Sequence, residues 1–186
     1  MSQVKISGNA SGTGVLTIAA PNTNTDRSIT IPDKAGAIAV GAGTIVQVVQ
    51  GTTSTQVSLS STTFTDTTLT ASITPTSSSN KILVMVCQHA NAYVTSGSNG
   101  TAGIQIVRGS TTIYEALKNT SSVPYQFGSS GTGIQGYITI NFLDSPSTTS
   151  STTYKTQGAA GTQNVIFQGN DLTNAVSTIT LMEIVA

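Results

Sequence analysis

The chain has 186 residues, only 8% of them charged, and its 7 basic and 7 acidic side chains cancel. An ordinary soluble domain is about 25% charged, so this chain depends for its solubility on neutral groups, and Ser and Thr together fill 57 positions. Sparse, balanced charge argues against electrostatic capture of nucleic acid or of an anionic membrane. One His, one Cys and no Trp exclude disulfide frameworks and Cys/His zinc clusters. We expect no metal site and no cofactor.

The start of the chain lacks the apolar run of a signal peptide, since residues 1–6 are followed by Gly and Ser. The most apolar segment, residues 82–87, is too short to span a membrane. We therefore expect synthesis in the cytoplasm and no membrane insertion.

Residues 1–43 are predicted to form a separate β-rich module. Short apolar segments at 15–20, 28–33 and 37–40 alternate with turn-forming residues. A chain of about 40 residues without a disulfide or metal rarely folds alone, so these strands are expected to pack on the next domain or on copies of themselves. An oligomer is the simplest consequence.

After the Gly-Ala-Gly sequence at 41–43, a larger all-β domain is predicted over residues 44–186. Its apolar residues are β-branched and alternate with Thr, Ser or Gln, which is the two-residue period of half-buried strands. The expected strands cover residues 44–50, 56–60, 68–74, 81–92, 103–108, 111–115, 136–143, 152–157, 164–168 and 177–185. Turns spaced about 8–12 residues apart predict a β-sandwich or jelly roll.

No catalytic motif stands out. The G-x-G-x-x-G match at 131–136 precedes an expected strand, whereas a dinucleotide fingerprint must open a helix. Cys87 and His89 share a strand face but lack a third orienting group, so we interpret Cys87 as a small buried hydrophobe and His89 as a loop-end or interface residue. Asp144, before Ser-Pro, is expected to cap backbone amides in a turn. These observations predict a protein that is not an enzyme.

Three aromatic residues in expected loops, Tyr93, Tyr125 and Phe127, are candidates for surface recognition. An exposed ring can stack on a sugar, and a neutral, hydroxyl-rich rim can supply hydrogen bonds. Ordinary packing is the alternative interpretation of all three residues.

The residues at 8–33, with Gly14-Val15-Leu16-Thr17-Ile18 followed by Pro21-Asn22-Thr23 and Arg27-Ser28-Ile29-Thr30-Ile31-Pro32-Asp33, resemble a segment of tail-fibre and other virion proteins of tailed phages, including phages of marine cyanobacteria. Segments at 79–84, 106–109, 144–149, 153–155 and 179–184 are similar to the C-terminal domains of such proteins. The resemblance implies a homotrimeric appendage of the virion that ends in a jelly-roll head.

Two functions follow from the resemblance. In the first, the chain is a short tail or head fibre: residues 1–43 bind other virion proteins, and the trimeric head contacts a host-surface glycan through weak, multivalent sites. In the second, it is a capsid decoration or cement protein that stabilises the head shell without host contact. About 43 residues before the head leave no room for a long shaft, and both functions predict a location on the virion.

Overall fold

The computed structural model describes Ser11, Asn24 and residues 41–93, 100–115, 126–127, 133–161, 164–169 and 175–186. The chain divides into two units, Met1–Ile38 and Ala39–Ala186, and the fold described below belongs to the second unit. The short strands expected within residues 1–43 lie outside the described residues.

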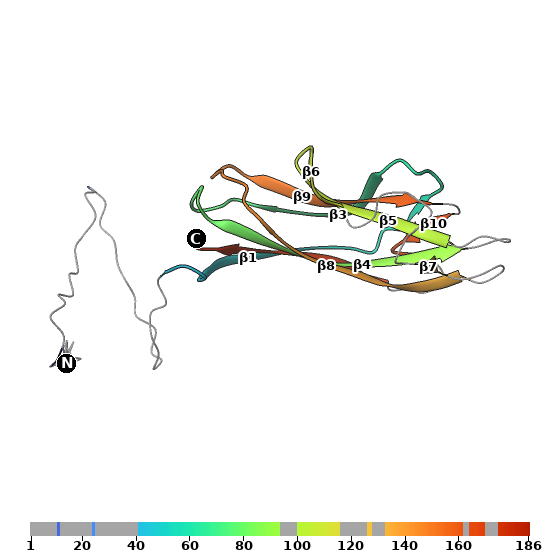
Figure 1. The fold of residues 1–186 in the computed structure, drawn as a ribbon, viewed down its shortest axis with the longest axis horizontal. Helices are drawn as coiled ribbons and strands as arrows, with labels where there is room; N and C mark the ends of the chain where they lie inside the picture. Colours follow the sequence, from blue (N-terminus) through green and yellow to red (C-terminus); the bar gives the residue numbers. More distant parts are fainter. Residues whose placement is uncertain are drawn as a thin grey trace. The chain divides into compact units, whose positions relative to one another are not determined.

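Eleven strands and no helix occur in the described part of unit two, so the prediction of an all-β domain is confirmed (Figure 1). The strands form two antiparallel sheets. Sheet A contains β1 (Ile45–Thr53), β2 (Val57–Leu59), β4 (Lys81–Tyr93), β8 (Gly133–Asp144), β10 (Val165–Phe167) and β11 (Ser177–Ile184). Sheet B contains β3 (Thr65–Ile73), β5 (Gly100–Arg108), β6 (Thr111–Glu115), β7 (Gln126–Phe127) and β9 (Thr152–Ala160). Each of the ten expected strands overlaps an observed one, and β7 was not expected.

The strand order is that of a jelly roll. The long strand β4 pairs with β8 along one edge and, along the other, with β11 and β10 placed end to end. When the short strands β2, β7 and β10 are set aside, sheet A runs β1-β11-β4-β8 and sheet B runs β3-β9-β5-β6. Numbered one to eight along the chain, these orders are 1-8-3-6 and 2-7-4-5, the double Greek key of a jelly roll.

The core lies between the sheets because alternate residues of each strand point inward. In β11, for example, the buried residues are every second one from Ser177 to Glu183. The largest buried apolar side chains come from both sheets and include Leu69, Ile82, Ile104, Ile106, Ile138, Tyr154, Phe167, Ile179 and Leu181. Branched aliphatic residues thus fill the sandwich, as the period-2 pattern of the sequence predicts.

An ion pair joins the sheets at one position in the interior. Arg108 of β5 donates from Nη1 to both carboxylate oxygens of Asp144, at 2.8 and 2.7 Å, and the Tyr154 hydroxyl donates to the same carboxylate at 2.7 Å. Burial and the neighbouring Asp144 charge raise the pKa of Tyr154. The expectation that Asp144 caps backbone amides in a turn was wrong, because its carboxylate turns inward to a cation and a buried phenol.

A second carboxylate, Glu183 of β11, is fully buried and has neutral partners. It accepts hydrogen bonds from the Thr76 backbone and hydroxyl at 2.7 and 2.8 Å, from Asn80 at 2.6 Å and from Gln47 at 2.5 Å. These donors belong to β1 and to the β3–β4 connection, so Glu183 fastens that connection to sheet A.

Candidate binding site

A pocket opens on the outer surface of sheet B where β3 bulges away from β9. Asp66 pairs with Gln157 and Thr70 with Lys155, so three residues of β3 stand opposite the single residue Thr156. The two extra residues form a large β-bulge in β3, and β-bulges reorient side chains next to functional sites.

The centre of the bulge is Thr68, whose φ of 66° lies in the left-handed region. A β-branched residue rarely adopts this conformation, which costs about 1–2 kcal/mol. Two contacts with β1 stabilise it. The Thr68 and Thr53 hydroxyls are 3.0 Å apart, and Gly51 has no side chain, which lets its strand approach the Thr70 carbonyl closely.

Beneath the bulge, a chain of buried polar side chains crosses the sandwich. The hydroxyls of Thr67 and Thr156 are 2.5 Å apart, and Thr156 donates to Gln88 Oε1 at 2.7 Å. Gln88 Nε2 donates to the Ser177 hydroxyl at 3.3 Å, which also accepts from the His89 backbone at 2.8 Å. Because these groups satisfy one another, the distorted strand is held in position from inside.

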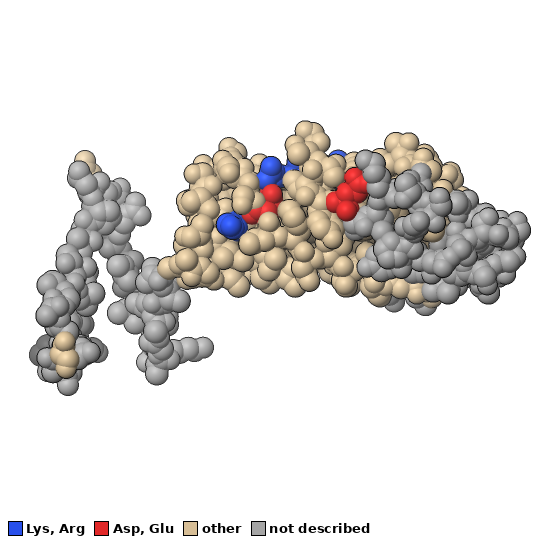
Figure 2. Space-filling model, in the orientation of Figure 1, with Lys and Arg blue, Asp and Glu red and all other residues tan. Residues whose placement is uncertain are grey.

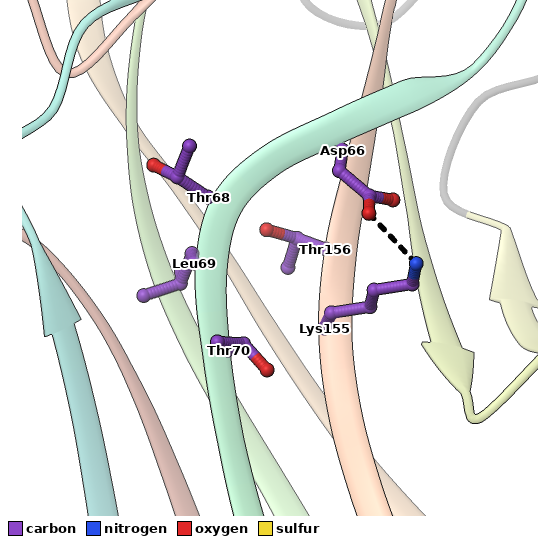
Figure 3. A pocket seen from close by; sticks show the side chains of 6 residues that line it. All are labelled: Asp66, Thr68, Leu69, Thr70, Lys155 and Thr156. Carbon is purple, nitrogen blue, oxygen red and sulfur yellow. Dashed lines mark hydrogen bonds and ion pairs between the residues drawn. The ribbon is translucent and has the colours of Figure 1, made fainter.

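The pocket has a volume of about 200 Å³ and is lined by Asp66, Thr68, Leu69, Thr70, Lys155 and Thr156 (Figure 3). Figure 3 shows Asp66 and Lys155 joined across one side of the pocket, with Leu69 and three threonine side chains around the rest. Pockets that enclose drug-sized ligands measure about 300–1,000 Å³. This one therefore accommodates one edge of a small polar group, such as a pair of sugar hydroxyls.

Asp66 and Lys155 give the pocket its polarity. Lys155 Nζ lies 2.7 Å from Asp66 Oδ2, and Gln157 Nε2 donates to Asp66 Oδ1 at 2.6 Å. The hydrogen bond from Lys155, followed by that from Gln157, holds the pKa of Asp66 below its ordinary value. Asp66 is therefore an ionised acceptor at neutral pH, next to an ammonium donor. Such a pair can bind a neutral hydroxylated ligand without favouring net charge of either sign.

The residues expected to recognise ligands lie elsewhere. Tyr93 ends β4 opposite Gly133 of β8, and Phe127 in β7 pairs with Gly100 of β5. Their strands meet, since β7 contacts both β4 and β8. The side chains of Tyr93 and Phe127, and all of Tyr125, lie outside the described residues. The aromatic site stays a prediction.

Sequence reasoning missed the pocket for a physical reason. Asp66 and Lys155 are 89 positions apart, and Thr68 lies in a Thr-rich run with no Gly to mark a left-handed residue. The alternation of Thr, Asp and Leu across 65–73 indicates a regular strand, and the bulge becomes visible only in its register with β9.

Cys87 and His89 occupy the outer face of sheet A, as expected for alternate strand residues. His89 is nevertheless within β4 and 99% buried, so its expected loop-end position was wrong. Its ring packs edge-on against Tyr137, with centroids 5.3 Å apart, and burial lowers its pKa. Cys87 is half-buried rather than buried, and neither ring nitrogen of His89 has a hydrogen-bond partner among the described residues.

The described residues contain no group of three or more His, Cys, Asp or Glu side chains arranged to hold a metal ion. A helix long and apolar enough to cross a membrane is likewise absent from them.

No protein-family model matches the sequence, and no curated protein is similar to it. Thirteen chains of solved structures match the fold. One, from the structure of infectious bursal disease virus Gt strain, aligns over 86% of this chain with 15% identity and a TM-score of 0.40. The alignment covers 42% of that chain, so this protein spans less than half of its length. Because the score is below 0.5, the conclusions that follow do not rest on this likeness.

Proposed function

We propose that the protein is a virion structural protein of a tailed phage, a homotrimeric short tail or head fibre whose jelly-roll head contacts the host cell surface. One observation carries the proposal: a jelly roll follows directly on an N-terminal segment, residues 8–33, that resembles phage virion proteins. Fold alone does not imply function, and the phage role is inferred from the jelly roll together with residues 8–33.

The pocket at the β3 bulge supports host contact. It offers an acceptor, Asp66, and a donor, Lys155, among threonine hydroxyls on an exposed surface, which suits the hydroxyls of a neutral glycan. A single pocket of about 200 Å³ binds weakly. Three copies on one trimer would bind a repetitive glycan more tightly through their effective concentration.

Binding to intact host cells tests this proposal. The fluorescently labelled protein is expected to bind cells of the strain that the phage infects, and soluble envelope polysaccharide from that strain should compete. Asp66→Asn should weaken binding at least about tenfold, because a hydrogen bond to a charged group contributes about 1.5–3 kcal/mol. Glu115→Gln, an exposed carboxylate in β6 outside the pocket, is the matched control.

The same experiment separates host contact from capsid decoration. A decoration role requires surface that is buried against the capsid shell rather than against the host cell. Saturable binding to phage heads with no binding to host cells would replace the fibre proposal with decoration. Binding to neither would remove both.

A further inference from the structure

The outer surface of sheet A carries most of the large apolar side chains exposed in the described residues. Val48 of β1 is 55% exposed, Leu143 of β8 47% and Met85 of β4 37%. Single exposed apolar residues are ordinary, whereas a contiguous patch of them marks an interaction site. Whether these residues are contiguous is therefore the deciding point.

The strand register shows that they are contiguous. Val48 lies opposite Met182, Met182 opposite Leu83, and Leu83 opposite Leu143, so one row of four apolar side chains crosses β1, β11, β4 and β8. Met85 lies two residues along β4, on the same side of the sheet. We call these five residues, Val48, Leu83, Met85, Leu143 and Met182, the A face.

The polar groups around the A face are neutral except for Lys81, the exposed first residue of β4, which lies two residues from Leu83 on the same side of the sheet. The row that contains Met85 is completed by Gln50, Thr180 and Asn141, which can both donate and accept hydrogen bonds. In the described strands of sheet A, the carboxylates of Asp144 and Glu183 are buried. Figure 2 shows no coloured charge along the lower margin of the described domain and one blue group toward its left end.

This chemistry suits a second copy of the same chain. Two surfaces with the same charge repel each other. Amides and hydroxyls, in contrast, can form hydrogen bonds with the same groups of a second copy. Two rows of apolar side chains can pack together without desolvating a charge. The five residues of the A face carry no charge, and the one cation in the described strands of sheet A, Lys81, lies at its margin.

The neighbouring edge of sheet A supports the same conclusion. Strand β8 pairs with β4 over twelve residues without a bulge, and the described strands provide no partner for its other edge. It contains no Pro or Lys, the residues that usually protect an exposed edge from pairing. The edge strands β1, β3 and β6, in contrast, each pair with an irregular register.

We propose that the A face, flanked by the free edge of β8, is the interface through which copies of this chain associate. This inference names the contact surface of the proposed oligomer and does not depend on host contact. Residues 1–43 are also expected to contribute to assembly, so the test must report on the A face itself.

Cysteine labelling measures how accessible the A face is to a reagent in solution. In a Cys87→Ser background, Leu143→Cys and Thr111→Cys are reacted with a maleimide while light scattering gives the native mass. Thr111 is an exposed residue of sheet B and serves as the control. We expect Leu143→Cys to react at least about tenfold more slowly than Thr111→Cys in an assembly larger than one 18.9 kDa chain.

A charge on the A face should reverse this protection. Adding Val48→Lys is expected to bring the labelling of Leu143→Cys within about twofold of the control, whereas Thr111→Lys, on the Leu143→Cys background, should leave it slow. Circular dichroism checks that each variant is folded. Equal labelling of both cysteines, or slow labelling of a monomer, would overturn the inference. Neither result changes the outcome of the cell-binding experiment, so the two proposals fail independently.

Discussion

The two outer surfaces of the sandwich differ in where they place their charges. Sheet B exposes Asp66 and Glu115 and keeps Lys155 beside a pocket, whereas sheet A turns both of its carboxylates, Asp144 and Glu183, inward. Figure 2 shows red and blue groups toward the layer of sheet B. Sheet B thus exposes carboxylates to water, whereas the five residues of the A face can be covered without burying a formal charge, with Lys81 of β4 exposed at the margin.

The two ion pairs of the described residues make the contrast measurable. Arg108–Asp144 and Lys155–Asp66 have the same closest distance, 2.7 Å, but the Asp144 side chain is 8% exposed and that of Asp66 53%. Equal geometry in different surroundings should give very different contributions to stability, because solvent screens the exposed pair.

The largest effect is expected from Asp144→Ala. Removing the carboxylate leaves Arg108 and the buried Tyr154 hydroxyl without their partner, so we expect a loss of about 3–5 kcal/mol in the free energy of unfolding. Urea titration measures this loss. Asp66→Ala is the control and should cost at most about 1 kcal/mol. Similar losses for the two variants would show that the buried and the exposed ion pair contribute equally to stability.

A smaller effect is expected from acid. Burial disfavours the Glu183 charge, but hydrogen bonds from Gln47, Asn80 and Thr76 outweigh it and lower the pKa from 4.5 to about 2. The folded-state pKa is depressed, so its contribution, about 3 kcal/mol, is present above pH 4.5 and lost as the pH falls toward 2.

Unfolding midpoints measured across this pH range test whether stability falls as the pH is lowered. The Glu183→Gln variant should lose this part of the acid sensitivity, whereas Asp66→Asn on sheet B should retain it. An unchanged pH profile in Glu183→Gln would mean that the buried carboxylate of sheet A does not control acid stability.

The smallest effect is expected from Thr68→Gly at the pocket. Glycine adopts a φ of 66° without steric strain, but the change removes the hydroxyl contact with Thr53. We expect a net gain of about 0.5–1 kcal/mol, seen as a higher urea midpoint. A loss of stability would show that the threonine hydroxyl, rather than backbone strain, dominates at the bulge.

Much of the fold could be predicted from the sequence because burial follows a two-residue period. The strand expected at 111–115 is β6 itself, and the one expected at 177–185 differs from β11 by one residue. Strand pairing was harder to predict from the sequence. The end-to-end placement of β11 and β10 beside β4 depends on contacts far apart in the chain, which periodicity does not encode.

The candidate site was much less predictable. Exposed aromatic residues are visible in a sequence, so Tyr93, Tyr125 and Phe127 were natural candidates. The pocket instead depends on a bulge at Thr68 and on an ion pair between distant residues, and neither leaves a local pattern. The inward turn of Asp144 was missed for the same reason, since its partners Arg108 and Tyr154 lie on other strands.

The pairing of β1 with β11 determines how this domain can be used as a scaffold. Ile45 lies opposite Ile184, and the Gly43 amide donates to the Val185 carbonyl at 2.8 Å, so the jelly roll starts and finishes at one end. Cargo fused after Ala186 would emerge beside the point where residues 1–43 join the domain. The Gly109–Ser110 turn between β5 and β6 lies at this same end, because Arg108 binds Asp144 and Asp144 lies opposite Ile82, which pairs with Glu183. Peptides meant for display at a distance from that junction are better inserted at the exposed residues 60–63 between β2 and β3.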